Sequence, residues 1–192
     1  NFPEPSLASF LLVAVAAFAL LWHLLHKQSL MDWGWTLLGM GYCGWLLGRL
    51  AALRLGPDGL EWTLLALLTT FAVDTSAFAV GRMVGRHRMA PRISPGKTWE
   101  GAAGGLVGAV AAALALGTLL GLPSNPVHFL AVGALVGVAG QIGDLAESWL
   151  KRRAGAKDSG WLIPGHGGVL DRLDSILFAS LVVYYYRVWV VA

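Results

Sequence analysis

The sequence predicts an all-α integral membrane protein, a polytopic bundle of about six transmembrane helices. Hydrophobic residues make up 56% of the 192 residues and charged residues only 13%, whereas soluble domains usually carry about 25% charged residues. Apolar stretches recur along the chain, each of about 20 residues, the length that crosses a hydrocarbon core. Both observations indicate that lipid surrounds most of the chain.

Six apolar segments predict the helices, in chain order at residues 7–25, 33–53, 60–80, 101–120, 127–150 and 175–191. Tryptophans near the segment ends are typical of anchors at the membrane interface. In the fifth segment, Gly133 and Gly137 form a pair of small residues four apart, which permits close helix contact in lipid. We interpret these glycines as packing residues, and small-residue faces of this kind are compatible with a homodimer.

One membrane domain is the simplest organisation. Residues 1–59 are expected to supply N-terminal membrane helices, and residues 60–192 the functional membrane domain with two basic connections, 82–100 and 151–173. The chain begins at Asn1, and no basic stretch precedes the first apolar run, so that run does not resemble a signal peptide. We therefore expect that the natural N-terminus is missing. The single cysteine, Cys43, excludes a disulfide within the chain.

The basic residues predict the orientation of the bundle. The two basic connections hold ten of the fourteen Lys and Arg residues, and the short connection at residues 121–126 holds none. The positive-inside rule places both basic connections in the cytoplasm, which predicts a multi-pass protein of the cytoplasmic (inner) membrane. As an alternative, these residues serve only to set topology or to bind anionic lipid headgroups.

Acidic residues inside membrane segments are costly and are functional candidates. Most of the candidates here fall where the predicted helices meet the basic connections, so they converge on the cytoplasmic side. Asp74 lies deeper, in the third helix. The spacing of the acids near the end of the fifth helix puts them on one face with Lys151. The candidates are Asp74, Glu100, Asp144, Glu147, Asp171 and Asp174.

Carboxylates beside basic connections suit a phosphate-rich ligand and a metal ion. Magnesium prefers oxygen ligands and is usually held by one or two carboxylates together with substrate phosphates. Lys and Arg side chains bind phosphate oxygens, and the glycines around His166 allow the backbone to approach a phosphate closely. Internal ion pairing, for example of Asp144 or Glu147 with Lys151, is the alternative interpretation.

Three stretches resemble the phosphatidate cytidylyltransferases, also called CDP-diacylglycerol synthases. The longest runs from Ser148 to Asp174, SWLKRRAGAKDSGWLIPGHGGVLDRLD, and resembles the signature of that family. Residues 74–82, DTSAFAVGR, and 94–101, SPGKTWEG, resemble two further motifs, with Gly96 in place of the usual lysine. The resemblance covers about residues 60–190, whereas residues 1–59 match only as hydrophobic helices.

The resemblance implies the transfer of a cytidylyl group from CTP to phosphatidic acid, with Mg²⁺, or Mn²⁺ in its place, at the site. The sequence leaves open a monovalent cation beside it. CTP, phosphatidic acid and the bilayer are the implied partners, and no nucleic acid is expected. The residues implied to act in catalysis are Asp171, Asp144, Lys151, Arg172 and His166. Those implied to bind substrate are Ser94, Lys97, Thr98, Glu100, Arg152, Lys157, Gly167, Gly168 and Asp74.

The individual roles follow from resemblance and position. Asp144 and Asp171 are the first choices as metal ligands, and Glu147 and Asp174 are second choices. Lys151, Arg172 and Lys97 would hold phosphates, and His166 would either donate to a phosphate or fix its loop. Two residues of the 94–101 stretch, Ser94 and Thr98, would either touch the nucleotide or cap the following helix.

Two other functions remain in view. A related CTP-dependent lipid kinase, acting on a polyprenol or phytol, would release CDP in place of pyrophosphate. A transporter of ions would place charges near the bilayer midplane in several helices. Because Asp74 is the one deep acid in the predicted bundle, the distribution favours an enzyme that faces the cytoplasm.

Overall fold

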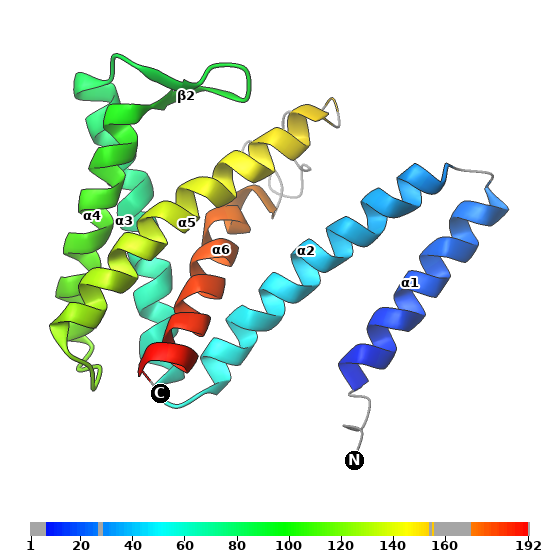
Figure 1. Ribbon diagram of the computed structural model, residues 1–192, viewed down its shortest axis with the longest axis horizontal. Coiled ribbons are helices and arrows are strands. Elements are labelled where there is room, and N and C mark those ends of the chain that lie inside the picture. The colour runs from blue at the N-terminus through cyan, green and yellow to red at the C-terminus, as the bar shows by residue number, and fades with distance from the viewer. Residues whose placement is uncertain (1–6, 27–28, 154, 156–169, 192) are drawn as a thin grey trace. The chain divides into compact units, whose positions relative to one another are not determined.

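The computed structural model describes residues 7–26, 29–153, 155 and 170–191, and the side chains of residues 7–12, 30, 43 and 170–172 lie outside that description. Its helices, shown in Figure 1, are α1 (Leu7–Leu25), α2 (Leu30–Leu55), α3 (Gly59–Val84), α4 (Trp99–Leu119), α5 (Pro126–Arg153) and α6 (Leu170–Tyr186), followed by the π-helical turn η1 (Arg187–Val191). A two-stranded antiparallel hairpin, β1 (Arg88–Ala90) and β2 (Ser94–Thr98), joins α3 to α4.

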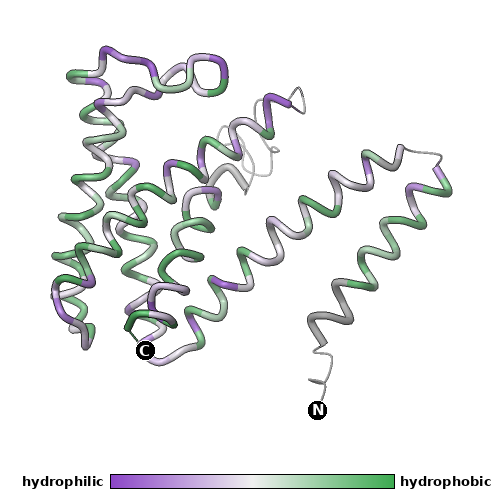
Figure 2. Tube along the Cα trace, viewed as in Figure 1, coloured by the Kyte–Doolittle hydropathy of each residue, from purple (hydrophilic) through white to green (hydrophobic). Residues whose placement is uncertain are grey.

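The prediction of an all-α polytopic membrane protein is confirmed. In the described part of the chain, five helices are long and apolar enough to cross a membrane, and they correspond to α2 to α6. The apolar helix α1 adds 19 residues. Figure 2 shows hydrophobic residues along the helices, while the hairpin between α3 and α4 is marked by hydrophilic ones. The helices could therefore be predicted from the sequence, and the hairpin could not.

Two compact units make up the chain, Asn1–Trp45 and Leu46–Ala192. The first unit contains α1 and the beginning of α2. The second contains the end of α2, the helices α3 to α6 and the hairpin. This division falls inside α2, and the expected boundary at residue 59 stays a prediction.

In the second unit, helices α3 to α6 form a closed bundle. Each helix packs against the next along the chain, and α6 returns to contact α3. The buried core of the bundle contains Trp62, Leu65, Val73, Phe129, Val132, Val136 and Val183. Small residues on α4, including Ala109 and Ala113, are fully buried among them. The helix axes can therefore approach closely, which gives the bundle a rigid base for a site at its end.

Glycines set the distance between α4 and α5. A Cβ atom on Gly133 would lie 2.7 Å from the Cα atom of Val110 and 2.8 Å from the carbonyl oxygen of Ala109. A Cβ atom on Gly137 would meet the Leu106 side chain at 2.9 Å. At Gly133, where the nearest neighbours are backbone atoms, only a residue without a side chain fits, and at Gly137 a larger residue would displace the end of the Leu106 side chain. The interpretation of these two glycines as packing residues is confirmed.

The two ends of the bundle differ in character. The hairpin and the basic end of α5 lie at the same end, where Nε of Arg152 lies 3.4 Å from the carbonyl oxygen of Ile93 in the hairpin turn. The connection from α4 to α5 lies at the opposite end (Figure 1). Helix α3 continues beyond the expected residue 80, so Arg82 lies in the helix and not in a loop. Helix α6 begins at Leu170, which places Asp174 one turn inside it.

Candidate functional site

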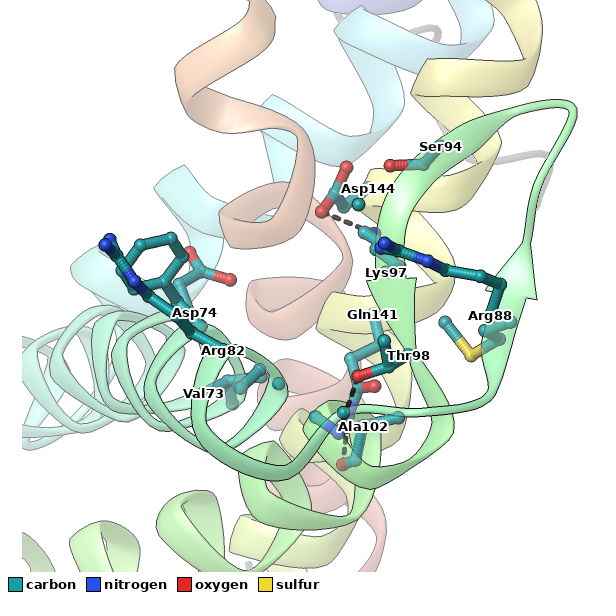
Figure 3. Close-up of a pocket in the computed structure, with 17 residues that line it drawn as sticks. Val73, Asp74, Arg82, Arg88, Ser94, Lys97, Thr98, Ala102, Gln141 and Asp144 are labelled. Atoms are coloured by element: carbon teal, nitrogen blue, oxygen red, sulfur yellow. Dashed lines mark hydrogen bonds and ion pairs between the residues drawn. The ribbon is translucent and has the colours of Figure 1, made fainter.

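A cavity of about 620 Å³ lies at the hairpin end of the bundle. Its walls come from α3, both strands of the hairpin, α4 and α5, and Figure 3 shows the side chains that converge there. Its polar lining consists of Asp74, Arg82, Arg88, Ser94, Lys97, Thr98, Gln141 and Asp144. The hairpin thus forms one wall of the cavity, although sequence reasoning treated it as a loop.

The centre of this lining is an ion pair between the hairpin and α5. Nζ of Lys97, on β2, lies 2.5 Å from Oδ2 of Asp144, on α5. Both side chains are partly accessible, with exposed fractions of 23% and 34%. The hydroxyl of Ser148, one turn along α5, lies 3.4 Å from the other carboxylate oxygen, Oδ1. Both side chains are therefore partly exposed, although the ammonium nitrogen of Lys97 is itself buried beside Asp144.

Two arginines add positive charge to the cavity. Arg82 comes from the last turns of α3 and Arg88 from β1, and both are exposed. The Arg88 guanidinium donates to the carbonyl oxygen of Pro95 across the hairpin at 2.7 Å. With Lys97, three cationic side chains line a cavity that also holds two carboxylates, Asp74 and Asp144. Such a lining suits an anion with several phosphate oxygens.

The predicted acids Asp74, Asp144 and Asp174 come from three helices and approach one another. Asp74 lies within electrostatic range of Asp144 and Asp174, and also of Lys97. Asp174 in turn lies within range of Asp144 and of Lys151 and Lys97. Asp174 itself is buried. Two ammonium groups therefore offset part of the repulsion among three carboxylates, as in a site that receives both cations and phosphates.

The donor chemistry of this cluster suits magnesium, because carboxylate oxygens are its preferred protein ligands. Among the side chains that the structure describes, no three His, Cys, Asp or Glu residues are grouped closely enough to hold a metal ion. Magnesium usually takes one or two carboxylates and completes its coordination with phosphates and water. The described residues therefore fit the role of partial ligands and do not form a complete protein cage.

Glu147 and Lys151 form a separate pair on α5. Nζ of Lys151 lies 2.5 Å from Oε2 of Glu147, one turn earlier. Glu147 has an exposed fraction of 1% and does not line the cavity. This contact is the internal ion pair of Glu147 with Lys151 that was the alternative interpretation of the sequence. Their predicted roles, as a second-choice metal ligand and as a phosphate-binding residue, are not tested by this contact.

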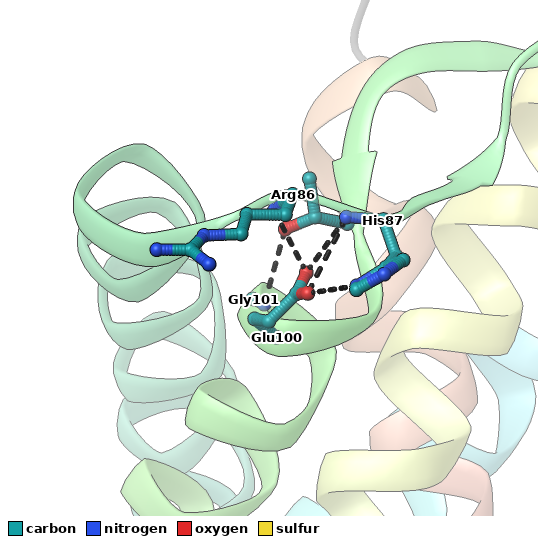
Figure 4. Close-up of polar contacts among 5 residues, drawn as sticks. Arg86, His87, Glu100 and Gly101 are labelled. Carbon is teal, nitrogen blue, oxygen red and sulfur yellow. Dashed lines mark hydrogen bonds and ion pairs between the residues drawn. The ribbon is translucent and has the colours of Figure 1, made fainter.

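The start of α4 carries two predicted residues with different surroundings. Thr98 lines the cavity and also caps the helix, since its hydroxyl oxygen accepts the backbone N–H of Gly101 at 3.1 Å. Glu100 lies outside the cavity lining. Its carboxylate accepts hydrogen bonds from the backbone N–H groups of Arg86 and His87 and lies 2.5 Å from Nδ1 of His87 (Figure 4).

Several predicted residues lie outside the described part of the chain, namely Lys157, His166, Gly167 and Gly168. The structure places Asp171 and Arg172 in the first turn of α6 by their backbone, and their side chains are not described. Arg152 is exposed near the hairpin turn. The roles of these residues remain predictions.

Sequence reasoning missed Arg82, Arg88 and Gln141 as site residues. The two arginines were counted among the basic residues of the first connection and were not singled out as site residues. Arg82 lies on α3 and Arg88 on β1, and nothing in a run of basic residues distinguishes those that line a cavity. Gln141 donates to the carbonyl oxygens of Ala102 at 3.2 Å and Gly137 at 2.8 Å, which ties α5 to α4 beside the cavity. A polar amide within an apolar segment, one turn before Asp144, was the available signal.

Comparison with known proteins gives consistent results. The model of the Cytidylyltransferase family matches residues 3–190. A phosphatidate cytidylyltransferase of Brucella abortus biovar 1 (strain 9-941) is 44% identical over 154 residues, 79% of this chain and 56% of that protein. The corresponding enzyme of Staphylococcus epidermidis (strain ATCC 35984) is 38% identical over 169 residues, 87% of this chain and 64% of that protein. An uncharacterized protein, YnbB of Escherichia coli (strain K12), is 41% identical over 164 residues, 84% and 54% of the two chains. The chain thus spans little more than half the length of most of these curated relatives.

Proposed function

The chain belongs to the cytidylyltransferase family, and from this premise we propose that it transfers the cytidylyl group of CTP to phosphatidic acid. The products are CDP-diacylglycerol and pyrophosphate. Relatives that are 38–44% identical carry the name phosphatidate cytidylyltransferase. The observation that carries the proposal is the cavity where Lys97, Arg82 and Arg88 meet the carboxylates of Asp74 and Asp144.

The reaction exchanges one phosphoanhydride bond for another. A phosphate oxygen of phosphatidic acid forms a bond to the α-phosphorus of CTP. The bond from that phosphorus to the bridging oxygen of the β-phosphate breaks, and pyrophosphate leaves with the electron pair. Positive groups that hold the phosphates in line stabilise the charge that grows in this step. No nucleophilic side chain is required, and the polar lining of the cavity supplies positioning and charge.

The cationic side chains take the phosphates in this proposal. Lys97 and Arg88 project from opposite strands of one hairpin, so a triphosphate can contact both. Arg82 lies on α3, where the neighbouring Phe78 also lines the cavity and is 67% exposed. This position suits the phosphate of a lipid, because the apolar surface beside it can receive acyl chains. Resemblance and position assign Lys151 and Arg172 to phosphate binding and Arg152, Lys157, Gly167 and Gly168 to substrate binding. His166 is proposed either to donate to a phosphate or to fix its loop.

Asp144 and Asp171 are proposed to hold Mg²⁺, with Glu147 and Asp174 as further candidates. When bound, the ion would neutralise phosphate charge and favour departure of pyrophosphate. Asp144 now pairs with Lys97 at 2.5 Å. Entering phosphates offer that lysine another partner, and the carboxylate is then available to the ion.

The proposed site faces the cytoplasm of a cell whose inner membrane the helices span. The support is the concentration of basic residues on the hairpin and on the end of α5 at the same end of the bundle. CTP is a cytosolic nucleotide, so this orientation brings the cavity to its substrate. A homodimer remains a proposal that rests on small-residue helix faces alone, and the pair Gly133 and Gly137 already serves the contact between α4 and α5.

The test is a product assay with the full-length protein in detergent, supplied with CTP, phosphatidic acid and MgCl₂. We expect CDP-diacylglycerol and pyrophosphate in equal amounts, and loss of both products after chelation of the metal. Release of CDP together with a phosphorylated lipid would identify a lipid kinase and reject the proposal. Absence of any nucleotide turnover, with ion uptake by reconstituted vesicles, would point to a transporter.

A further inference from the structure

The hairpin that forms one wall of the cavity has few attachments of its own. Two strands, of three and five residues, pair in antiparallel register, with Arg88 opposite Thr98 and Ala90 opposite Ser94. An isolated two-stranded hairpin is at best marginally stable in water. The side chains of Arg88 and Lys97 can hold a fixed place over the cavity only if the base of the hairpin is fastened to the helices.

The carboxylate of Glu100 anchors the start of the hairpin to α4 by hydrogen bonds. One oxygen, Oε2, accepts the backbone N–H groups of Arg86 and His87, both at 3.2 Å. The other, Oε1, lies 2.5 Å from Nδ1 of His87. Because an ionised carboxylate only accepts hydrogen bonds, Nδ1 carries the proton and donates it. Hydrogen bonds to a charged acceptor are stronger than those between neutral groups. The Glu100 side chain therefore binds the segment that follows α3, at Arg86 and His87 (Figure 4).

The contacts of Glu100 lie close in the sequence to both cationic residues of the hairpin, Arg88 and Lys97. His87 directly precedes Arg88, and its carbonyl oxygen accepts the N–H of Trp99 at 3.0 Å. On the other strand, Lys97 lies three residues before Glu100. Both strands therefore leave the helices at a point that Glu100 fixes. Glu100 itself does not line the cavity, so it acts on a ligand there through the hairpin and not by direct contact.

We propose that Glu100 is a positioning residue, whose contacts with the backbone of Arg86 and His87 hold Arg88 and Lys97 in place to bind the phosphates of the nucleotide. This inference rests on the proposed function, because it assigns those two cations to CTP. It also replaces the direct substrate contact that the sequence predicts for Glu100.

A merely stabilising role would look different in experiment. An acid in the first turn of a helix interacts favourably with the helix dipole wherever it occurs, and its loss lowers the stability of the helix without moving a binding group. Glu61 provides the matched control, because it lies in the first turn of α3, at the opposite end of the bundle. A positioning role is specific to Glu100 and must alter nucleotide binding.

The test compares Glu100→Gln with Glu61→Gln in the full-length protein. Glutamine preserves the size of Glu100 but turns one acceptor oxygen into an NH₂ donor that faces other donors. We expect the KM for CTP to rise about tenfold, a change that corresponds to about 1.4 kcal/mol, with kcat within about threefold of the wild-type value. Glu61→Gln should change neither constant. His87→Ala should raise the KM less, and adding it to Glu100→Gln should have little further effect, since both remove the same contact.

A second measurement does not depend on turnover. Spin labels at Arg92 in the hairpin turn and at Trp149 on α5, in a Cys43→Ser background, report the distance between the hairpin and the bundle. We expect Glu100→Gln to broaden the distance distribution and Glu61→Gln to leave it unchanged. An unchanged distribution in Glu100→Gln, or a large loss of kcat at unchanged KM, would overturn the inference. If the wild-type protein forms no CDP-diacylglycerol, the proposed function fails, and the spin-label comparison still decides whether Glu100 anchors the hairpin.

Discussion

Nζ of Lys97 and Oδ2 of Asp144 lie 2.5 Å apart and join the hairpin to α5 across the cavity. One partner is a group that binds phosphate, and the other is a group that binds metal ions. Each charge neutralises the other, which limits the cost of placing charges beside apolar helices. The ion pair therefore holds both groups at the cavity, and in the proposed function phosphates and a cation become their new partners.

Replacement of Lys97 by methionine tests the phosphate role. The variant keeps the length of the side chain and removes its charge, so we expect the KM for CTP to rise at least about tenfold, in keeping with the loss of a charged hydrogen bond to phosphate. Arg92→Gln is the matched control, because Arg92 is an exposed hairpin cation that does not line the cavity. Steady-state kinetics that give both variants the wild-type KM would remove Lys97 from the binding site.

The packing of α4 on α5 makes a prediction about stability. Gly133→Ala places a methyl group within 3.0 Å of Val110 and Ala109, and overpacking of this kind costs about 1–3 kcal/mol. Gly140→Ala, two turns along the same helix, meets its nearest atom only at 3.9 Å. Alanine also favours a helix over glycine by about 1 kcal/mol. We therefore expect Gly133→Ala to lower the unfolding temperature in detergent and Gly140→Ala to leave it equal or higher. Equal destabilisation by both variants would contradict the assignment of Gly133 to the helix contact.

The helices could be predicted from the sequence because each apolar run is long enough to cross a bilayer, and lipid leaves helical structure as the main option. The hairpin could not be predicted. Its second strand, Ser94–Thr98, contains Pro95 and Gly96, two residues that are depleted in strands. The strand exists because it pairs with residues 88–90, and this pairing depends on where α3 ends and α4 begins.

The same limit applies to the site. Asp74, Ser94, Lys97, Thr98 and Asp144 line the cavity as candidates named from the sequence. Glu100, which was also named, does not line the cavity. Its carboxylate instead accepts backbone N–H groups 13 and 14 residues earlier in the chain, which come close to it only because the hairpin folds back. Arg88, on β1, was missed for the same reason, whereas Arg82, on α3, could not be distinguished from its basic neighbours. Spacing along one helix identifies a shared face, but contacts between helices and a hairpin need the structure.

The orientation of the bundle predicts which residues a membrane-impermeant thiol reagent can reach. In a Cys43→Ser background, Arg92→Cys in the hairpin turn should be protected in intact cells and labelled after lysis. Ser124→Cys, in the connection between α4 and α5 at the opposite end, should be labelled in intact cells. The reason is the positive-inside rule applied to the basic hairpin and the basic end of α5. The reverse pattern would put the cavity on the side away from cytosolic CTP and reject the proposed function.

Asp171 is predicted to carry more of the catalysis than any other residue. It lies in the first turn of α6, one turn before the buried Asp174, and Asp144 on α5 is its natural partner as a ligand of the metal ion. A metal-bound carboxylate contributes several kcal/mol to the stabilisation of transition-state charge. At about 1.4 kcal/mol for each tenfold change in rate, a loss of about 4 kcal/mol would slow turnover about a thousandfold. Asp171→Asn keeps the shape of the side chain, so this loss should occur in a protein that still folds.

The measurement is turnover as a function of magnesium concentration for Asp171→Asn, Asp144→Asn and the control Asp158→Asn, with gel filtration to confirm that each variant folds. Asp144→Asn should raise the magnesium concentration that gives half of the maximal activity, because it removes one ligand and leaves Lys97 without its anionic partner. Asp158→Asn, which precedes the glycine stretch in the sequence and lies outside the described residues, should have a milder effect. A folded Asp171→Asn enzyme with turnover within about tenfold of wild type, a difference of only about 1.4 kcal/mol, would refute the assignment of Asp171 to the metal. The second-choice ligands, Asp174 and Glu147, would then be the residues to examine.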